Sequence, residues 1–275
     1  MQQSLLEQFP ALREPLSAVA EVAGYIWQKG WGERNGGNIT LNVSSCLPAV
    51  LPAIAQPVAL GMCLPHIAGM YFYAKGTQKR MRDLAREPLH NGCVLRITAD
   101  GSAYEVVGDR VVPPTSELPS HLMVQDYLQQ TGSRYTATLH THPIELVALS
   151  HHRRFLDDTT RPNRLTHTLW SMIPETLAFA PLGIGIVPYE VPGSMALAQA
   201  TLERMKDYDV ALWEKHGVFA VGQDIMDAFD QVDVLNKAAR IYLDAKTAGD
   251  EPEGMTDAAM RDVQRIFALP TVRPC

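Results

Sequence analysis

The stretch Thr136-Ala137-Thr138-Leu139-His140-Thr141-His142, which Pro143 follows, decides the fold of this chain. Its pattern predicts a strand with Leu139 on one face and with His140 and His142 on the other, because strand side chains alternate with period two. Pro143 ends the strand, since proline cannot donate to a ladder. The two imidazoles can converge on one cation, and histidine is the commonest metal ligand. The alternative is a half-exposed strand face that carries two ordinary polar residues.

The segments on both sides predict a sheet flanked by helices. The other expected strands span residues 39–43, 70–73, 93–98, 104–107, 183–187, 210–213 and 218–221. Helices are expected at 10–30, at 117–130 with Thr115 or Ser116 as the cap, from 143 onward, and at 194–207, 224–248 and 256–268. The proline-rich residues 45–65 are expected to form an extended surface connection. Because hairpins join strand pairs and no repeat or linker is evident, residues 1–275 are expected to form one α/β domain with a central, mostly antiparallel sheet.

Composition excludes several classes of function. The chain has 275 residues, of which 46% are hydrophobic and 20% charged, as in ordinary globular proteins. A formal net charge of -6 and the lack of a basic run disfavour a nucleic-acid partner. The four cysteines (Cys46, Cys63, Cys93 and Cys275) form no C-x-x-C pair, so neither a cysteine zinc site nor a disulfide framework is expected. Because neither a signal peptide nor an unbroken apolar stretch of membrane length is evident, a cytoplasmic location is expected.

Two further residues have side chains suited to a metal-assisted reaction. His216 lies in a predicted hairpin turn before Gly217, and such a turn can aim an imidazole off the rim of a sheet. Glu117 lies in the expected first helical turn, where it would be either a carboxylate that interacts with the helix dipole or a general base near a cation. The other histidines have no partner at metal spacing and are expected to be ordinary polar residues.

Two glycine-containing segments are candidate anion sites. Successive glycines in Asn35-Gly36-Gly37-Asn38 allow backbone N–H groups to face one point, and the asparagine amides add donors. The alternative is a tight turn. Gly76-Thr77, with Lys79 and Arg82, is a second candidate, for which a solvated basic helix face is the alternative.

Taken together, these motifs resemble the class II aldolase/adducin family. The matching segments occur in the family order and are residues 33–41, 114–121 (Pro-Thr-Ser-Glu-Leu-Pro-x-His), His140-x-His142, 191–193 and 216–219. The resemblance implies a largely antiparallel sheet between helices and a homotetramer with fourfold symmetry and its active site at the subunit interface. Within this pattern, Thr77 stands where serine is usual, and the second glycine of that phosphate segment is missing.

The resemblance also implies roles for individual residues. His140, His142 and His216 correspond to the ligands of one zinc ion per subunit, and Glu117 to the acid/base carboxylate. Glu175 corresponds to a carboxylate that reaches the site from a neighbouring subunit. The residues that correspond to the phosphate pocket are Asn35, Gly37, Asn38, Thr77, Thr115 and Ser116.

The activity implied is a zinc-dependent, reversible retro-aldol cleavage of a sugar phosphate. The expected substrate is L-rhamnulose 1-phosphate, and the expected products are dihydroxyacetone phosphate and L-lactaldehyde. An aldolase or epimerase of the same fold that acts on L-fuculose 1-phosphate or on ribulose 5-phosphate is the alternative. A non-catalytic, adducin-like module is a third possibility, which the presence of all three histidines disfavours. No nucleic-acid or membrane partner is expected.

Overall fold

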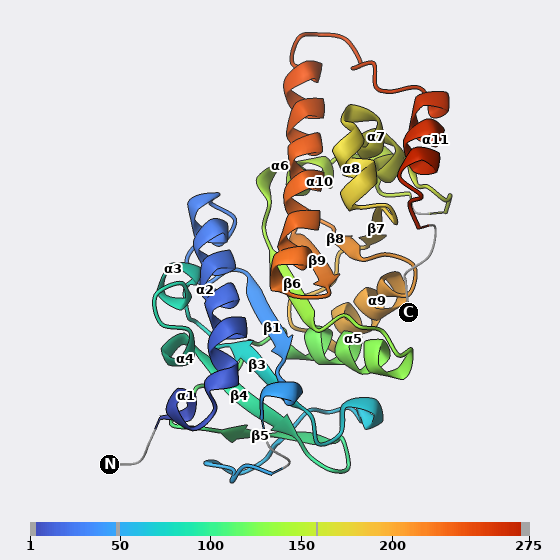
Figure 1. Cartoon of the computed structure of the whole chain (residues 1–275). Helices are drawn as coiled ribbons and strands as arrows, with labels where there is room; N and C mark the ends of the chain where they lie inside the picture. The colour runs from blue at the N-terminus through green and yellow to red at the C-terminus, as the bar shows by residue number, and fades with distance from the viewer. Residues whose placement is uncertain (1–3, 48–49, 158, 271–275) are drawn as a thin grey trace.

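A nine-stranded sheet runs through the part of the chain that the computed structural model describes, residues 4–47, 50–157 and 159–270. Its strand order is β2-β5-β4-β3-β1-β6-β9-β8-β7 (Figure 1). Neighbouring strands are antiparallel, except that β7 and β8 are parallel. In chain order the strands are β1 (Asn38–Asn42), β2 (Val58–Ala59), β3 (Tyr71–Lys75), β4 (Gly92–Ile97), β5 (Ala103–Val107), β6 (Ala137–Thr141), β7 (Ile184–Val187), β8 (Val210–Trp213) and β9 (Gly217–Gly222). The expected α/β class and the mostly antiparallel sheet are confirmed.

Strand β6 lies in the interior of this sheet, between β1 and β9. Leu139 pairs with Ile39 on one side and with Ala220 on the other. All five residues of β6 are buried, so the alternative of a half-exposed strand is wrong. The strand also ends at Thr141, one residue earlier than the sequence pattern predicts, and the N–H of His142 donates to the carbonyl of Trp31 at 2.9 Å.

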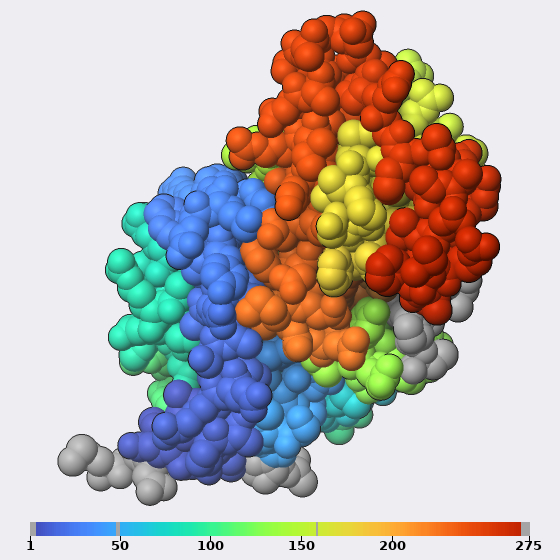
Figure 2. Space-filling view, turned by 45° about the horizontal axis from the view of Figure 1, so that its top comes forward, coloured from blue at the N-terminus to red at the C-terminus, as the bar shows by residue number. Residues whose placement is uncertain are grey.

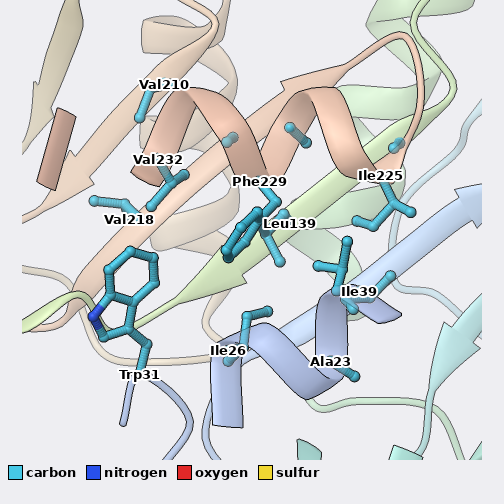
Figure 3. Packing of buried hydrophobic residues seen from close by; sticks show 14 of the residues in the cluster. Ala23, Ile26, Trp31, Ile39, Leu139, Val210, Val218, Ile225, Phe229 and Val232 are labelled. Carbon is cyan, nitrogen blue, oxygen red and sulfur yellow. The ribbon is translucent and has the colours of Figure 1, made fainter. Parts of the chain in front are cut away.

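Helices cover both faces of the sheet (Figure 1). On one face α2 (Arg13–Gln28) and α10 (Ile225–Lys246) pack Ile26 and Phe229 against the apolar side chains of the central strands (Figure 3). On the other face lie α5 (Leu118–Gln130) and α9 (Met195–Met205), which pack against β8 and β9. Burying apolar surface on both faces stabilises the fold at about 25 cal/mol per Å². The candidate site forms at the C-terminal end of β6, between the two helix layers.

The remaining helices are short or lie at the ends of the sheet. Helices α7 (Arg164–Met172), α8 (Pro174–Phe179) and α11 (Asp257–Ile266) gather beside α10, and Figure 2 shows α11 in red against them. Trp170, Leu177 and Met260 form a small core between them. The others are α1 (Leu5–Gln8), η1 (Pro10–Leu12), η2 (Ser44–Cys46), η3 (Pro65–Ile67), α3 (Met81–Leu84), α4 (Pro88–Asn91), α6 (Ile144–Leu149) and η4 (Arg153–Phe155). Within the described residues, no helix is long and apolar enough to cross a membrane.

Some expectations about local structure are wrong. The proline-rich stretch is not a plain surface connection, because Leu51 and Leu64 are buried and β2 pairs with β5. Neither Thr115 nor Ser116 occupies the N-cap of α5, since the helix begins at Leu118 and Glu117 is the cap residue. The hydroxyl of Thr115 instead accepts from the N–H of Glu117 at 3.2 Å, which holds the turn before the helix.

Replacing Asp224 by alanine should lower the free energy of unfolding by about 1 kcal/mol. The Asp224 side chain caps α10 by accepting from the N–H of Asp227 at 2.9 Å, and alanine leaves that N–H unpaired. Urea denaturation measures the change. Asp244→Ala on the same helix is the matched control, because its exposed pair with Arg240 contributes little. An equal loss in both variants would refute the capping contribution.

Candidate active site

The structure brings the three candidate metal ligands together. His140 is on β6, His142 follows it, and His216 lies in the turn between β8 and β9. One ring nitrogen from each of the three lies within 4.8 Å of the others. His140 is 1% exposed, whereas His142 and His216 are partly buried. The β8–β9 hairpin and the antiparallel pairing of β9 with β6 produce this convergence, since together they place the turn at the end of β6.

The hydrogen bonds of His140 and His142 fix which nitrogens face the cluster. Nδ1 of His140 lies 2.9 Å from the carbonyl oxygen of Val218, so it carries the hydrogen. Nδ1 of His142 likewise donates to the carboxylate of Glu33, at 2.7 and 2.9 Å from its two oxygens. In the neutral rings both Nε2 atoms are therefore lone-pair atoms, and they lie 3.0 Å apart. Two lone pairs at this distance repel, so the pair requires a positive charge beside them.

A metal ion fits this requirement better than a proton does. Burial, together with the neighbouring His142 and His216, lowers the pKa of His140 well below its ordinary value. Burial also lowers the pKa of His216 to about 4, and its buried Nδ1 has no hydrogen-bond partner. These rings therefore stay neutral at physiological pH, and neutral imidazole is the form that binds metals.

The surroundings hold the rings in place. The indole of Trp213 stacks on His140, with ring centroids 4.3 Å apart. A side chain at Gly217 would lie 2.7 Å from Cδ2 of His142 and 2.9 Å from Cε1 of His140. Only glycine therefore leaves room for both rings beside the hairpin turn.

Glu117 lies directly against the histidine cluster. Its Oε2 is 3.4 Å from Nε2 of His140, and its Oε1 is 3.6 Å from Nε2 of His216. The amide of Asn38 donates to Oε2 and orients the carboxylate. Burial raises the pKa of Glu117 to about 7, although the charge of Lys75 and the Asn38 hydrogen bond act in the opposite direction. A carboxyl group with such a pKa can both accept and donate a proton near neutral pH.

A cavity of about 340 Å³ opens beside these residues. Its lining includes the three histidines and Glu117. It also includes all six residues expected to bind phosphate, which are Asn35, Gly37, Asn38, Thr77, Thr115 and Ser116. The structure thus joins the metal and phosphate candidates, which are far apart in the sequence, around one cavity.

The loop from Asn35 to Asn38 lines the cavity and packs against two of the histidines. Gly37 has φ of 76°, a left-handed conformation that favours glycine, and a side chain there would lie 3.1 Å from the carbonyl oxygen of His140. A side chain at Gly36 would lie 2.9 Å from Cε1 of His142. The loop can therefore pack against the candidate metal ligands only because of its two glycines.

Some sequence candidates lie elsewhere. Glu175 is an exposed residue in the first turn of α8 and does not line this cavity. Lys79 does not line it either, and the guanidinium of Arg82 lies over the Trp27 ring at 5.2 Å. The suggestion that Lys79 and Arg82 bind the anion within this chain is therefore not supported.

The other histidines fit the expectation of ordinary polar residues. His121 is fully buried on α5, and its Nδ1 pairs with the Thr138 hydroxyl at 2.7 Å. Three further histidines each pair with a carboxylate, namely His66, His90 and His167. The side chains of His151 and His152 are exposed.

Sequence reasoning missed two residues of this site. Glu33 binds His142, and Lys75 lines the cavity with its ammonium group donating to the carbonyl of Asn35 at 2.9 Å. Glu33 precedes the glycine loop directly, so its place in the motif was a usable signal. Lys75 ends a buried strand, where an ionisable residue is rare enough to indicate a role.

Replacing Glu33 by alanine should weaken metal binding about 10- to 100-fold. Without Glu33, no acceptor among the described residues holds His142 in the tautomer that presents Nε2 to the cluster. Competition with a chromophoric chelator measures the affinity, and Glu33→Gln should retain part of it because the amide oxygen still accepts. Glu21→Ala, which removes an exposed carboxylate on α2, is the control. Wild-type affinity in Glu33→Ala would rule out this orienting role.

Comparison with known proteins agrees with this geometry. Residues 17–243 match the family model of the class II aldolase and adducin N-terminal domain. A rhamnulose-1-phosphate aldolase of Bacteroides thetaiotaomicron is 53% identical, with 97% of this chain and 99% of that protein covered. A rhamnulose-1-phosphate aldolase of Klebsiella pneumoniae is 32% identical, over 86% of this chain and 85% of the relative. Among solved structures, a sugar-phosphate aldolase from Thermotoga maritima has a TM-score of 0.76 and 32% identity, covering 88% of this chain and 99% of its own.

Proposed function

This chain belongs to the class II aldolase and adducin family, and on that premise we propose that it cleaves L-rhamnulose 1-phosphate reversibly to dihydroxyacetone phosphate and L-lactaldehyde. One observation carries the proposal: three imidazoles, one buried carboxylate and six phosphate-type donors line the same cavity. Similarity to rhamnulose-1-phosphate aldolases over almost the whole chain supports the choice of substrate.

We propose that one zinc ion per subunit is held by His140, His142 and His216. Zinc is suited to this set, because it accepts three imidazole ligands and keeps a position open in catalytic sites. When bound, it would supply Lewis acidity that stabilises negative charge developing on a carbonyl oxygen of the substrate. Glu33 and the carbonyl of Val218 would keep the imidazole Nε2 atoms directed at it.

Glu117 transfers the proton that C3 of the substrate gains on cleavage. Cleavage breaks the C3–C4 bond of the ketose, and a base removes the C4 hydroxyl proton as the aldehyde leaves. The carboxyl group of Glu117 then donates its proton to C3, which yields dihydroxyacetone phosphate. In the condensation direction the Glu117 carboxylate removes that proton again. Asn38 holds the carboxylate in position for both directions.

The phosphate group is expected to bind among the hydroxyl and amide donors of the cavity. Thr77, Thr115 and Ser116 contribute hydroxyl groups to its lining, and the Asn35–Asn38 loop contributes amide and backbone N–H groups. Binding energy from the phosphate would hold the reacting carbons against Glu117 and the histidines.

We further propose that the active protein is a homotetramer in which Glu175 completes the site of a neighbouring subunit. Glu175 is exposed and lies outside the cavity of its own chain, as such a residue must. The exposed Phe179 on the same helix gives this surface an apolar contact residue. Glu175 is then the candidate base for the C4 hydroxyl proton.

Glu175→Gln should lower kcat by roughly 10²-fold and leave the metal content unchanged. Mixing is the decisive measurement, because Glu117→Gln and Glu175→Gln subunits co-assembled in one oligomer would create some sites that carry neither substitution. Activity should then reappear. No recovery in verified hybrids would contradict a contribution across the interface.

Comparison of kcat/KM for three substrates tests the proposed function. L-Rhamnulose 1-phosphate should be preferred over L-fuculose 1-phosphate and L-ribulose 5-phosphate, with dihydroxyacetone phosphate and L-lactaldehyde identified as the products. A preference for fuculose phosphate would overturn the substrate alone. Epimerisation without cleavage would overturn the reaction.

A further inference from the structure

His121 has no part in the reaction above, although it lies one helical turn after Glu117 on α5. Its side chain is fully buried, and its Nδ1 lies 2.7 Å from the hydroxyl oxygen of Thr138 on β6. That hydroxyl donates to the carbonyl of Thr40 on β1 at 3.3 Å, so the ring nitrogen carries the hydrogen and donates to the hydroxyl oxygen. This chain of hydrogen bonds connects α5 to β6 and, through β6, to β1.

Stability alone does not explain a histidine at position 121. Among the described residues, Nε2 of His121 is buried and has no hydrogen-bond partner. Such an atom destabilises a fold, and an apolar side chain of similar size would avoid the cost. Burial and the charge of Lys75 lower the pKa of His121 to about 3, so the ring is too weak a base to exchange protons near neutral pH. What distinguishes it from an apolar residue is the hydrogen bond that Nδ1 donates.

The contacts of Glu117 and His121 with β6 match in spacing. Glu117 contacts His140, with its Oε2 3.4 Å from Nε2 of the ring. His121 lies four residues further along α5, and its partner Thr138 lies two residues earlier on β6. Four helical residues rise about 6 Å, and two strand residues span about 6.7 Å and return to the same face of the sheet. The second contact therefore repeats the first, one turn along the helix.

A third contact continues this series. The amide of Gln125, a further four residues along α5, donates to the carbonyl of Thr136 at 2.9 Å. Thr136 again lies two residues before the preceding partner, Thr138. Polar contacts at three successive turns thus fix the position of α5 along β6. The contact next to Glu117 in this series is the one that His121 makes.

We propose that His121 is a positioning residue for the reaction: its hydrogen bond with Thr138 fixes the first turn of α5 along β6 and thereby holds the carboxyl group of Glu117 against the histidine cluster. This inference rests on the proposed function and adds a residue that acts through Glu117. Proton transfer to carbon needs close contact, and a displacement of about 1 Å can lower a rate about a hundredfold. Loss of this hydrogen bond therefore lowers kcat without removing a group that binds metal or substrate.

His121→Leu and His121→Asn form a matched pair, because leucine and asparagine have the same branched shape. Asparagine can place its amide nitrogen where Nδ1 lies and donate to Thr138, whereas leucine cannot. We expect kcat for L-rhamnulose 1-phosphate to fall at least about tenfold in His121→Leu and less than about threefold in His121→Asn. KM should stay within about twofold of wild type in both variants, with metal content unchanged.

Thermal denaturation of the same pair separates positioning from packing. Asparagine buries an additional polar atom, so the Tm of His121→Asn should be no higher than that of His121→Leu. The variant with the higher kcat is therefore not the more stable one. Equal kcat values in the two variants, or a kcat that follows the Tm, would overturn the proposal, because packing alone explains either result.

Thr138→Val removes the other partner of the hydrogen bond and keeps the shape of the side chain. It should lower kcat about as much as His121→Leu, and the double variant should lower it no further, since both changes break one interaction. Additive losses in the double variant would contradict a shared role.

Gln125→Leu is the control on the same helix, because it removes the contact of α5 with Thr136 at the next turn. Its kcat should fall less than that of His121→Leu, since the contact beside Glu117 remains. An equal loss would show that attachment of the helix in general is what matters, and would overturn the assignment of His121.

Crystal structures of the metal-loaded wild type and of the matched pair need no turnover, so the two levels of inference can fail separately. The distance from Oε2 of Glu117 to Nε2 of His140 should lengthen in His121→Leu and match wild type in His121→Asn. If it does so while wild type cleaves none of the three ketose phosphates, the proposed function fails and the positioning of Glu117 stands. If wild type cleaves L-rhamnulose 1-phosphate but the two variants do not differ in this distance or in kcat, only the assignment of His121 fails.

Discussion

Removal of bound metal is expected to lower the rate of sugar-phosphate cleavage at least about a thousandfold. The charged side chains that contact the three histidines are Glu117 and Glu33, which are acidic and cannot stabilise a developing oxyanion. The imidazoles of His140 and His216 are neutral, because burial lowers their pKa values. Without a metal ion, no charged group among the described residues in contact with the histidines offsets the negative charge.

The measurement is activity after dialysis against a chelator, with metal content determined on the same samples. Zinc, cobalt and manganese added back singly would show which metals support the reaction, since three imidazoles bind each of them. His140→Ala should stay inactive after the addition of metal, whereas His151→Ala, which changes an exposed histidine, should behave as wild type. Full activity in metal-free protein would contradict a metal-dependent mechanism.

Glu117→Gln is expected to lower kcat by about 10³-fold while metal content stays at the wild-type level. Glutamine has the same shape as glutamate, and its oxygen can still accept from Asn38, so the cavity should keep its form. The amide cannot exchange a proton with carbon, which is the step assigned to Glu117. A conservative change therefore has a very large effect only if the carboxyl group takes part in chemistry.

Asn38→Ala provides the comparison for this variant. It removes the donor that orients Glu117 and keeps the carboxyl group, so its loss of kcat should be smaller than that of Glu117→Gln. A Glu117→Gln enzyme with more than a tenth of the wild-type kcat would show that another residue carries the proton.

Local sequence signals predicted the framework of the fold well. The alternation around Leu139 and His140, and the helix starts expected at Ser194 and Asp224, depend on neighbours in sequence, so they could be identified without the fold. Helices α7 and α8 were not predicted, because each is short and proline separates them. The burial of Leu51 and Leu64 also escaped prediction, since it depends on pairing between distant segments.

The candidate site shows the same contrast between local sequence signals and properties of the tertiary fold. The motif pattern singled out the histidines and Glu117, but periodicity alone left each with an ordinary alternative. Their convergence follows from the pairing of β6 with β9, which no local pattern encodes. The raised pKa of Glu117 results from burial, which depends on the tertiary fold. The environment of Lys75 is likewise a tertiary property.

Hydrogen exchange on dihydroxyacetone phosphate tests the central claim most directly, because it isolates the proton transfer between Glu117 and C3 from cleavage. Metal-loaded protein in D₂O, without aldehyde, should replace one carbon-bound hydrogen beside the carbonyl, observed by NMR. Chelated protein and Glu117→Gln should exchange it at least about a hundredfold more slowly. Exchange at the wild-type rate in either of these samples would contradict the joint action of the metal site and Glu117.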